Sequence, residues 1–275
     1  MVVRAIFRDA RGAKDVALCV RDDNPADGVA GPDQGAKKAK VYLWPSEFHA
    51  LVTCDRVPRR WRRLFALAVY TYARAGELAA LEWSDVDLEH GTVHIHRSAD
   101  KRRGRGLKAT KSETARRIPI EPTLLPLFKA LFIDARGKGR VVRMPSAGTL
   151  SDRLKFYLRR AGVERADLFE SDATRKAITF HDLRASGITW CAVRGDDPLK
   201  IMQRAGHTDF ETTKIYLREA ENLSHGFGEV FPALPGDLLG SIVPESPRAI
   251  PGRGIAGKMA GSSWADRDSN PGPTD

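Results

Sequence analysis

The chain has 275 residues, of which 45 are lysine or arginine and 35 are aspartate or glutamate, giving a formal charge of +10. This length allows one substantial core with flexible ends, and the charge favours a polyanionic partner, nucleic acid before an anionic membrane. No apolar run approaches the roughly 18 residues of a membrane span, and the N-terminus lacks a signal-peptide core, which argues against membrane insertion and export and for a cytoplasmic location.

The first 40 residues are expected to form a remnant helix, within residues 1–18, and a linker. Residues 21–40 are dense in Asp, Gly, Pro and Lys, a composition typical of linkers. A domain is expected over residues 41–223. Its first two helices begin at a Pro-Ser-Glu signal at residues 45–47 and in the apolar stretch from Trp61, where Leu64, Phe65, Ala68 and Tyr72 share one face.

Two short stretches have the pattern of strands. Residues 91–97 and 116–120 are expected to pair, joined by a long polar connection. Helical periodicity returns at residues 123–134, 149–162, 182–194, 197–205 and 212–222. The sequence therefore predicts a mainly α fold with a small antiparallel β-sheet (α+β).

The C-terminal part changes character after Leu223. Residues 224–243 carry a few large apolar side chains, too few for a core and without an obvious place in their own chain, so this segment is expected to dock on a neighbour. Residues 244–275 are rich in Pro, Gly, Ser and charge, and are expected to be disordered.

The three cysteines, Cys19, Cys54 and Cys191, have neither zinc-type nor CxxC spacing. They are interpreted as small buried hydrophobes. No carboxylate cluster of the metal-nuclease type is apparent in the sequence, so no metal site is predicted.

The segment "HDLR" suggests an anion site. His181 and Arg184 lie three positions apart, so on a helix they share a face. An arginine fork suits phosphate, and histidine titrates near neutrality. The simpler interpretation is a histidine at a helix start and a surface arginine.

Arg74 precedes Glu77 by three positions, which fits an ion pair on a solvated helix face or a glutamate that orients a phosphate-binding arginine. Lys108 and Lys111 lie near the start of the second strand. Either these lysines only attract a polyanion through their charge, or one of them is a mobile ammonium that donates a proton to a leaving alkoxide. The spacing to Pro119 favours Lys111 over Lys108.

His207 and Tyr216 are nine positions apart. On one unbroken helix this separation turns through about 900° and leaves the two side chains on opposite faces. Thr208 with Glu211 has capping-box form, so a break is expected that lets both side chains converge. Tyr216 is then a candidate nucleophile, with its phenolate favoured by surrounding positive charge; the alternative is a half-buried helix residue.

Together these motifs resemble the tyrosine recombinase or phage integrase family over residues 41–232, the extent of its catalytic domain. The matching residues are Arg74, Lys111, His181, Arg184, His207 and Tyr216. Two features depart from the family. Only about 20 residues precede the linker, where the family usually has a helical core-binding domain, so that domain is expected to be missing. Ala205 stands where the family often has leucine.

The resemblance implies a site-specific recombinase that acts on the attachment sites of double-stranded DNA as a homotetramer, exchanging C-terminal segments between protomers. Tyr216 would form a 3′-phosphotyrosyl intermediate, without metal, ATP or any other cofactor. The implied roles are transition-state stabilisation by Arg74 and Arg184, hydrogen bonding by His207, protonation of the leaving oxygen by Lys111, and transfer of the tyrosine proton by His181.

Two basic runs are expected to contact DNA, although such runs are also typical of solvated faces. The candidate residues are Arg59, Arg60, Arg63, Lys101, Arg102, Arg103, Arg105 and Lys108. Two other functions stay open. One is a type IB topoisomerase, whose family usually has lysine at the position of His181. The other is an inactive fragment that only binds DNA.

Overall fold

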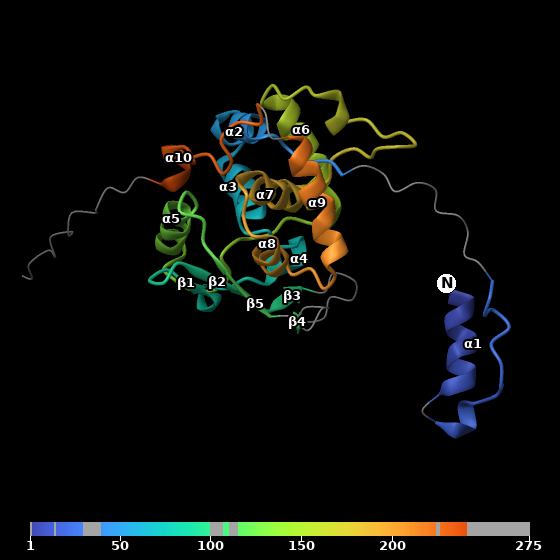
Figure 1. Ribbon diagram of the computed structural model, residues 1–275. Coiled ribbons are helices and arrows are strands. Elements are labelled where there is room, and N and C mark those ends of the chain that lie inside the picture. Colours follow the sequence, from blue (N-terminus) through green and yellow to red (C-terminus); the bar gives the residue numbers. More distant parts are fainter. Residues whose placement is uncertain are drawn as a thin grey trace, which may run out of the picture. The chain divides into compact units, whose positions relative to one another are not determined.

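The computed structural model describes residues 2–13, 15–29, 40–99, 107–109, 115–223 and 226–240 (Figure 1). Its helices are α1 (Val2–Gly12), α2 (Pro45–Thr53), α3 (Arg59–Tyr70), α4 (Ala75–Ala80), α5 (Leu125–Ala135), α6 (Ala147–Arg160), α7 (Phe180–Arg194), α8 (Pro198–Ala205), α9 (Phe210–Asn222) and α10 (Gly236–Leu239). Short 3-10 turns are η1 (Val16–Leu18), η2 (Trp83–Asp85) and η3 (Ala166–Leu168). Among these helices, none is both long enough and apolar enough to cross a bilayer.

The strands are β1 (Val86–Asp87), β2 (Thr92–Ile95), β3 (Arg97–Ala99), β4 (Leu107–Ala109) and β5 (Arg116–Pro119). The antiparallel pairing of β2 with β5 confirms the two predicted strands, and β1 adds a third. The register places Val93 opposite Ile118 and Ile95 opposite Arg116. The predicted class, mainly α with a small antiparallel sheet, is confirmed.

Helices α3 and α7 pack at the centre of the core (Figure 1). A Cβ at Gly187 of α7 would lie 2.0 Å from the Val69 carbonyl oxygen, so glycine permits this close approach. Helix α3 ends at Tyr70, before the predicted apolar face ends at Tyr72. Tyr72 is buried beyond the helix and has a left-handed backbone, with φ 53°.

Residues 226–240 pack against their own chain. The Phe231 ring lies 5.3 Å from the Tyr70 ring and 5.4 Å from the Trp190 ring, and Leu238 of α10 is fully buried. The expectation that these apolar residues lack a place in cis is therefore wrong, because an aromatic cluster in the core receives them. Residues 244–275 lie outside the described residues.

The prediction for the cysteines is correct only for Cys191, which is buried. Cys54 is half-buried and Cys19 is exposed. Cys19 follows η1, where none of the turn's residues is buried, so no core is available to receive it.

Candidate active site

The start of α7 positions His181 and Arg184. The Asp182 carboxylate accepts hydrogen bonds from the Thr179 backbone N–H at 2.8 Å and from its hydroxyl at 2.7 Å, a capping box that fixes the first turn. His181 lies in that turn, and Arg184 follows three residues later on the same side. Only 4% of Arg184 is exposed, so its interpretation as a surface arginine is wrong.

The Arg184 guanidinium donates hydrogen bonds to two backbone carbonyls, those of Tyr72 and Ala205. Burial and the charge of nearby Arg74 lower the pKa of Arg184 to about 9, because both disfavour a cation. A phosphate bound here would counteract both effects, since it supplies the opposite charge and further acceptor oxygens.

Glu77 joins two arginines from distant parts of the chain. Its carboxylate accepts hydrogen bonds from the Arg74 backbone N–H at 2.8 Å, from Arg74 Nη1 at 3.0 Å, and from Arg116 at 2.7 and 3.2 Å. Glu77 is 3% exposed, so the predicted pair with Arg74 forms, but not on a solvated face. Burial raises the pKa of Glu77, yet its bonds and charge interactions with Arg116 and Arg74 outweigh burial and lower it.

Arg74 differs from the other arginines of the site because its side chain is 41% exposed. It precedes the first residue of α4, where the chain has just left α3 through the turn at Tyr72. Its guanidinium is held on one side by Glu77 and is open to solvent on the other. It is therefore able to contact a bound ligand.

Arg116 is a residue of this site that sequence reasoning missed. The pleat of β5 buries Arg116 and Ile118 and leaves Arg117 exposed, and this alternation was the signal available in the sequence. Both Nη atoms of Arg116 bind Glu77, and Nε donates to the Arg204 carbonyl oxygen at 3.0 Å. Its guanidinium is thus committed to protein partners.

The C-terminal end of α8 holds all three guanidiniums. Three successive carbonyls, those of Arg204, Ala205 and Gly206, accept hydrogen bonds from Arg116 at 3.0 Å, from Arg184, and from Arg74 at 3.4 Å. The last carbonyls of a helix have no partner within it and carry its partial negative charge. The end of α8 therefore orients the cationic groups of the site.

The predicted break between His207 and Tyr216 is confirmed. Helix α8 is followed by Gly206 in a left-handed conformation, with φ 63°, and α9 begins after Asp209. Asp209, not the predicted Thr208, caps α9, because its carboxylate accepts a hydrogen bond from the Glu211 N–H at 3.0 Å.

This break places the two rings side by side. The His207 and Tyr216 rings stack with their centroids 5.9 Å apart and their planes 14° apart. His207 Nδ1 lies 3.0 Å from the Thr213 hydroxyl, which fixes the imidazole. Tyr216 is buried and close enough to Arg184 for their charges to interact.

The histidines of the site are neutral at pH 7. Burial, followed by the charges of Arg184 and Arg74, lowers the pKa of His207 to about 4. Desolvation by surrounding protein atoms, followed by the charge of Arg184, also lowers the pKa of His181. Burial raises the pKa of Tyr216, and the charge of Arg184 lowers it as expected, but burial outweighs that charge and the net pKa is raised in the DNA-free protein.

The candidate DNA contacts fall into three groups. Lys101, Arg102, Arg103, Arg105 and Lys111 lie outside the described residues, and so does the side chain of Lys108, whose backbone pairs with Ser98. Arg59 and Arg60 are exposed at the start of α3. The prediction that Arg63 contacts DNA is corrected, because Arg63 donates hydrogen bonds to the Asp134 carboxylate and to the Leu238 carbonyl oxygen, both at 2.7 Å, and is therefore not free for DNA.

The structure thus brings together five of the six predicted catalytic residues, Arg74, His181, Arg184, His207 and Tyr216, through contacts and mutual charge effects. The profile of the Phage integrase family matches residues 43–222. The chain belongs to the phage integrase family. Its fold is that of tyrosine recombinase catalytic domains.

Named relatives of this family member come from several bacteria. It is 30% identical over 219 residues to a Mycobacterium tuberculosis protein named as the phiRv2 prophage integrase, covering 75% of this chain and 53% of that protein. It is 26% identical over 210 residues to the ICEBs1 integrase of Bacillus subtilis, covering 69% and 53%. It is 25% identical over 198 residues to tyrosine recombinase XerC of Pseudomonas aeruginosa, covering 70% and 59%. The chain therefore spans little more than half the length of these relatives.

Solved structures share the fold. The Tn1549 transposon integrase in complex with a circular intermediate DNA is 18% identical, with a TM-score of 0.59 over 78% of this chain and 71% of that one. A lambda integrase dimer bound to a COC′ core site is 17% identical, with a TM-score of 0.53 over 78% and 56%.

Proposed function

We propose that this integrase family member is a site-specific DNA recombinase that cuts and rejoins DNA through a 3′-phosphotyrosyl intermediate, without metal or ATP. The observation that carries the proposal is the stacking of Tyr216 on His207 beside the buried cation Arg184. A phenol, two neutral imidazoles and two arginines able to face one anion form a set suited to phosphoryl transfer.

In the proposed reaction, the Tyr216 hydroxyl oxygen attacks the scissile phosphorus and the bond from phosphorus to the 5′-oxygen breaks. His181, which is neutral, accepts the phenol proton; Lys111 protonates the leaving 5′-oxygen. Arg74 and Arg184 stabilise the non-bridging oxygens, and His207 donates a hydrogen bond to one of them. A 5′-hydroxyl of the partner strand then attacks the phosphotyrosine and releases the enzyme.

The raised pKa of Tyr216 fits this sequence of proton transfers. A buried phenol keeps its proton until a base removes it, so the nucleophile forms only when substrate and base are both in place. The phosphodiester adds negative charge near His181, which favours the protonated imidazole that the step requires. The same negative charge of the phosphodiester becomes a partner for the Arg184 guanidinium.

The partners we propose are the attachment sites of double-stranded DNA and three further copies of the chain, which form a homotetramer on DNA in the cytoplasm. The named DNA complexes of the Tn1549 and lambda integrases support a DNA partner. We also propose a domain organisation in which residues 41–223 form the catalytic domain, preceded by a helix and a linker within residues 1–40 and followed by a C-terminal segment that packs on the core of the same domain.

The experiment is covalent trapping. Purified protein is incubated with nicked duplexes tiled across the DNA that flanks its gene, and adducts resistant to SDS are measured. We expect an adduct with the wild-type chain and none with Tyr216→Phe, because the variant lacks the attacking oxygen. Tyr157→Phe is the matched control, since this buried tyrosine lies in α6 and should leave the adduct unchanged.

The outcomes separate the three functions. Adduct formation with exchange of strands supports the recombinase. Relaxation of supercoils without strand exchange would favour a type IB topoisomerase. Retention of specific DNA binding with no adduct on any nicked duplex would leave a DNA-binding fragment and refute the proposed reaction.

A further inference from the structure

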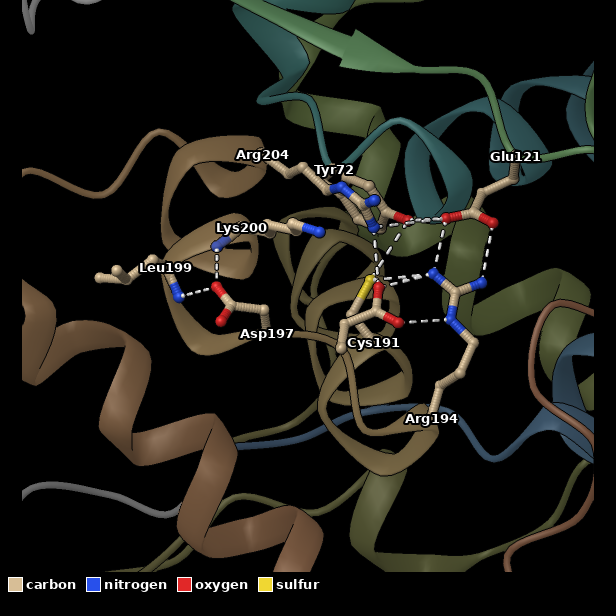
Figure 2. A network of polar contacts seen from close by, with 9 residues as sticks. Tyr72, Glu121, Cys191, Arg194, Asp197, Leu199, Lys200 and Arg204 are labelled. Carbon is tan, nitrogen blue, oxygen red and sulfur yellow. Dashed lines mark hydrogen bonds and ion pairs between the residues drawn. The ribbon is translucent and has the colours of Figure 1, made fainter.

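A polar network centred on the buried side chains of Tyr72 and Glu121 lies next to the candidate active site. Figure 2 shows the side chains of Tyr72, Glu121, Arg194 and Arg204 converging from separate parts of the chain. The Tyr72 hydroxyl donates to Glu121 Oε1 at 2.7 Å, and Arg194 donates to both Glu121 oxygens at 2.8 and 3.0 Å. Burial raises the pKa of Glu121, but its bonds to Arg194 and Tyr72 outweigh burial and lower it. The network is therefore built around a charged carboxylate.

Tyr72 has an unfavourable backbone conformation. Its φ of 53° lies in the left-handed region, which favours glycine and is rarely adopted by a bulky side chain. This conformation ends α3, turns the Tyr72 carbonyl toward Arg184, and leads within two residues to Arg74. The strained turn therefore sets the positions of the exposed Arg74 and of the buried Arg184.

The Tyr72 side chain counteracts this strain. It is 1% exposed, its hydroxyl bonds to Glu121, and its ring lies 6.2 Å from the ring of Phe231 in an edge-on arrangement. A backbone flip to negative φ would move the hydroxyl away from Glu121 and leave a buried carboxylate with one donor fewer. The hydrogen bond therefore favours the strained conformation.

The same network reaches α8. Arg204 Nη1 lies 2.7 Å from Asp196 and 4.0 Å from Glu121, which ties the last turn of α8 to the network. The carbonyls that hold Arg116, Arg184 and Arg74 belong to this turn and the residue after it. Glu121 thus connects to both backbone elements that orient the guanidiniums.

We propose that Tyr72, held by Glu121, is a positioning residue for DNA cleavage: its buried hydroxyl stabilises the left-handed turn that aims Arg184 and Arg74 at the scissile phosphate. Tyr72 does not touch the substrate. This inference rests on the proposed function for its kinetic test, but it also predicts a change in the DNA-free protein.

The kinetic test compares Tyr72→Phe with Tyr70→Phe, measuring single-turnover adduct formation at saturating nicked duplex and the Kd for the same DNA. Both substitutions remove one buried hydroxyl, but that of Tyr70 bonds to the Pro232 carbonyl and not to the network. We expect Tyr72→Phe to slow cleavage about tenfold, the effect of losing one hydrogen bond to a charged group, with Kd changed by less than about twofold. Tyr70→Phe should cleave like the wild type.

A glycine variant separates positioning from stability. Tyr72→Gly adopts positive φ without strain but loses the buried ring. We expect it to cleave faster than Tyr72→Phe although its thermal midpoint is lower. Equal cleavage by Tyr72→Phe and Tyr70→Phe, or cleavage that follows thermal stability across all three variants, would overturn the inference.

A measurement without DNA keeps the two proposals distinguishable. The pKa of His207, about 4 in this structure, is lowered first by burial and then by the nearby charge of Arg184, and it is measurable by NMR titration. Displacing Arg184 in Tyr72→Phe should move that pKa toward the ordinary value, whereas Tyr70→Phe should not. If the wild type forms no adduct but this shift occurs, the proposed function fails and the positioning role stands; an unchanged pKa in Tyr72→Phe contradicts the positioning role.

Discussion

Replacing Arg116 by methionine tests the electrostatic core of the site. The substitution leaves Glu77, whose side chain is 2% exposed, with Arg74 as its remaining cationic partner, and removes both Arg116 hydrogen bonds to the carboxylate. Breaking a buried ion pair by removing one member costs about 3–5 kcal/mol. Because Arg74 remains, we expect the lower end, about 3 kcal/mol of unfolding free energy, or a fall in Tm of about 6–12 °C for a domain of this size.

The assay is equilibrium unfolding in urea, with calorimetry for Tm. Arg117→Met is the matched control, since its side chain is the exposed neighbour in β5 and should change stability by less than about 0.5 kcal/mol. The double variant Glu77→Gln with Arg116→Met should be more stable than the two single losses predict, by about 1 kcal/mol or more. Equal stability of Arg116→Met and Arg117→Met would refute the assignment of Arg116 to a buried pair.

Three further predictions concern stability. The pKa of His207 falls to about 4 in the folded chain, so between pH 6.5 and pH 4 the unfolded chain binds a proton at His207 that the folded chain does not. The unfolding free energy should therefore fall by about 1–2 kcal/mol, after allowance for solvent exposure, as the pH falls from 6.5 toward 4. His207→Gln should flatten this part of the curve of unfolding free energy against pH. Phe231→Ala should lower the unfolding free energy by about 3–5 kcal/mol, measured in urea, because four aromatic and cationic groups pack on this ring; a loss below about 1 kcal/mol would contradict packing in cis. Gly187→Ala should lower the unfolding free energy by about 1–3 kcal/mol in the same assay. Gly148→Ala in α6 should not lower it, because a Cβ there meets no atom.

Local periodicity was sufficient to predict the residues that one turn or one cap controls. His181 and Arg184 share the first turns of α7 because their three-residue spacing matches a helix, and a capping signal between His207 and Tyr216 predicted the break. The wrong choice of Thr208 over Asp209 moved the cap by one residue, which is the usual uncertainty of a helix end.

Residues fixed by tertiary contacts were not predictable in this way. Arg116 enters the site because its strand pairs with Ile95 and because Glu77, 39 positions earlier, receives its guanidinium. The left-handed turn at Tyr72 depends on Glu121, 49 positions later. The small number of apolar residues in the C-terminal segment also led to the wrong expectation that they have no place in their own chain. A few aromatic side chains are enough there, because they only complete a core that the rest of the domain already forms.

The way in which the site balances its charges bears on its chemistry. Among the described residues, Glu77 is the carboxylate that binds Arg74 and Arg116, and backbone carbonyls hold Arg184. A carboxylate on every guanidinium would compete with a phosphate, whereas carbonyls at a helix end orient the cations with only about half a unit of negative charge in total. Burial, followed by the resulting excess of positive charge, keeps both histidines neutral, so they are able to accept or donate a hydrogen bond at once when the phosphodiester arrives.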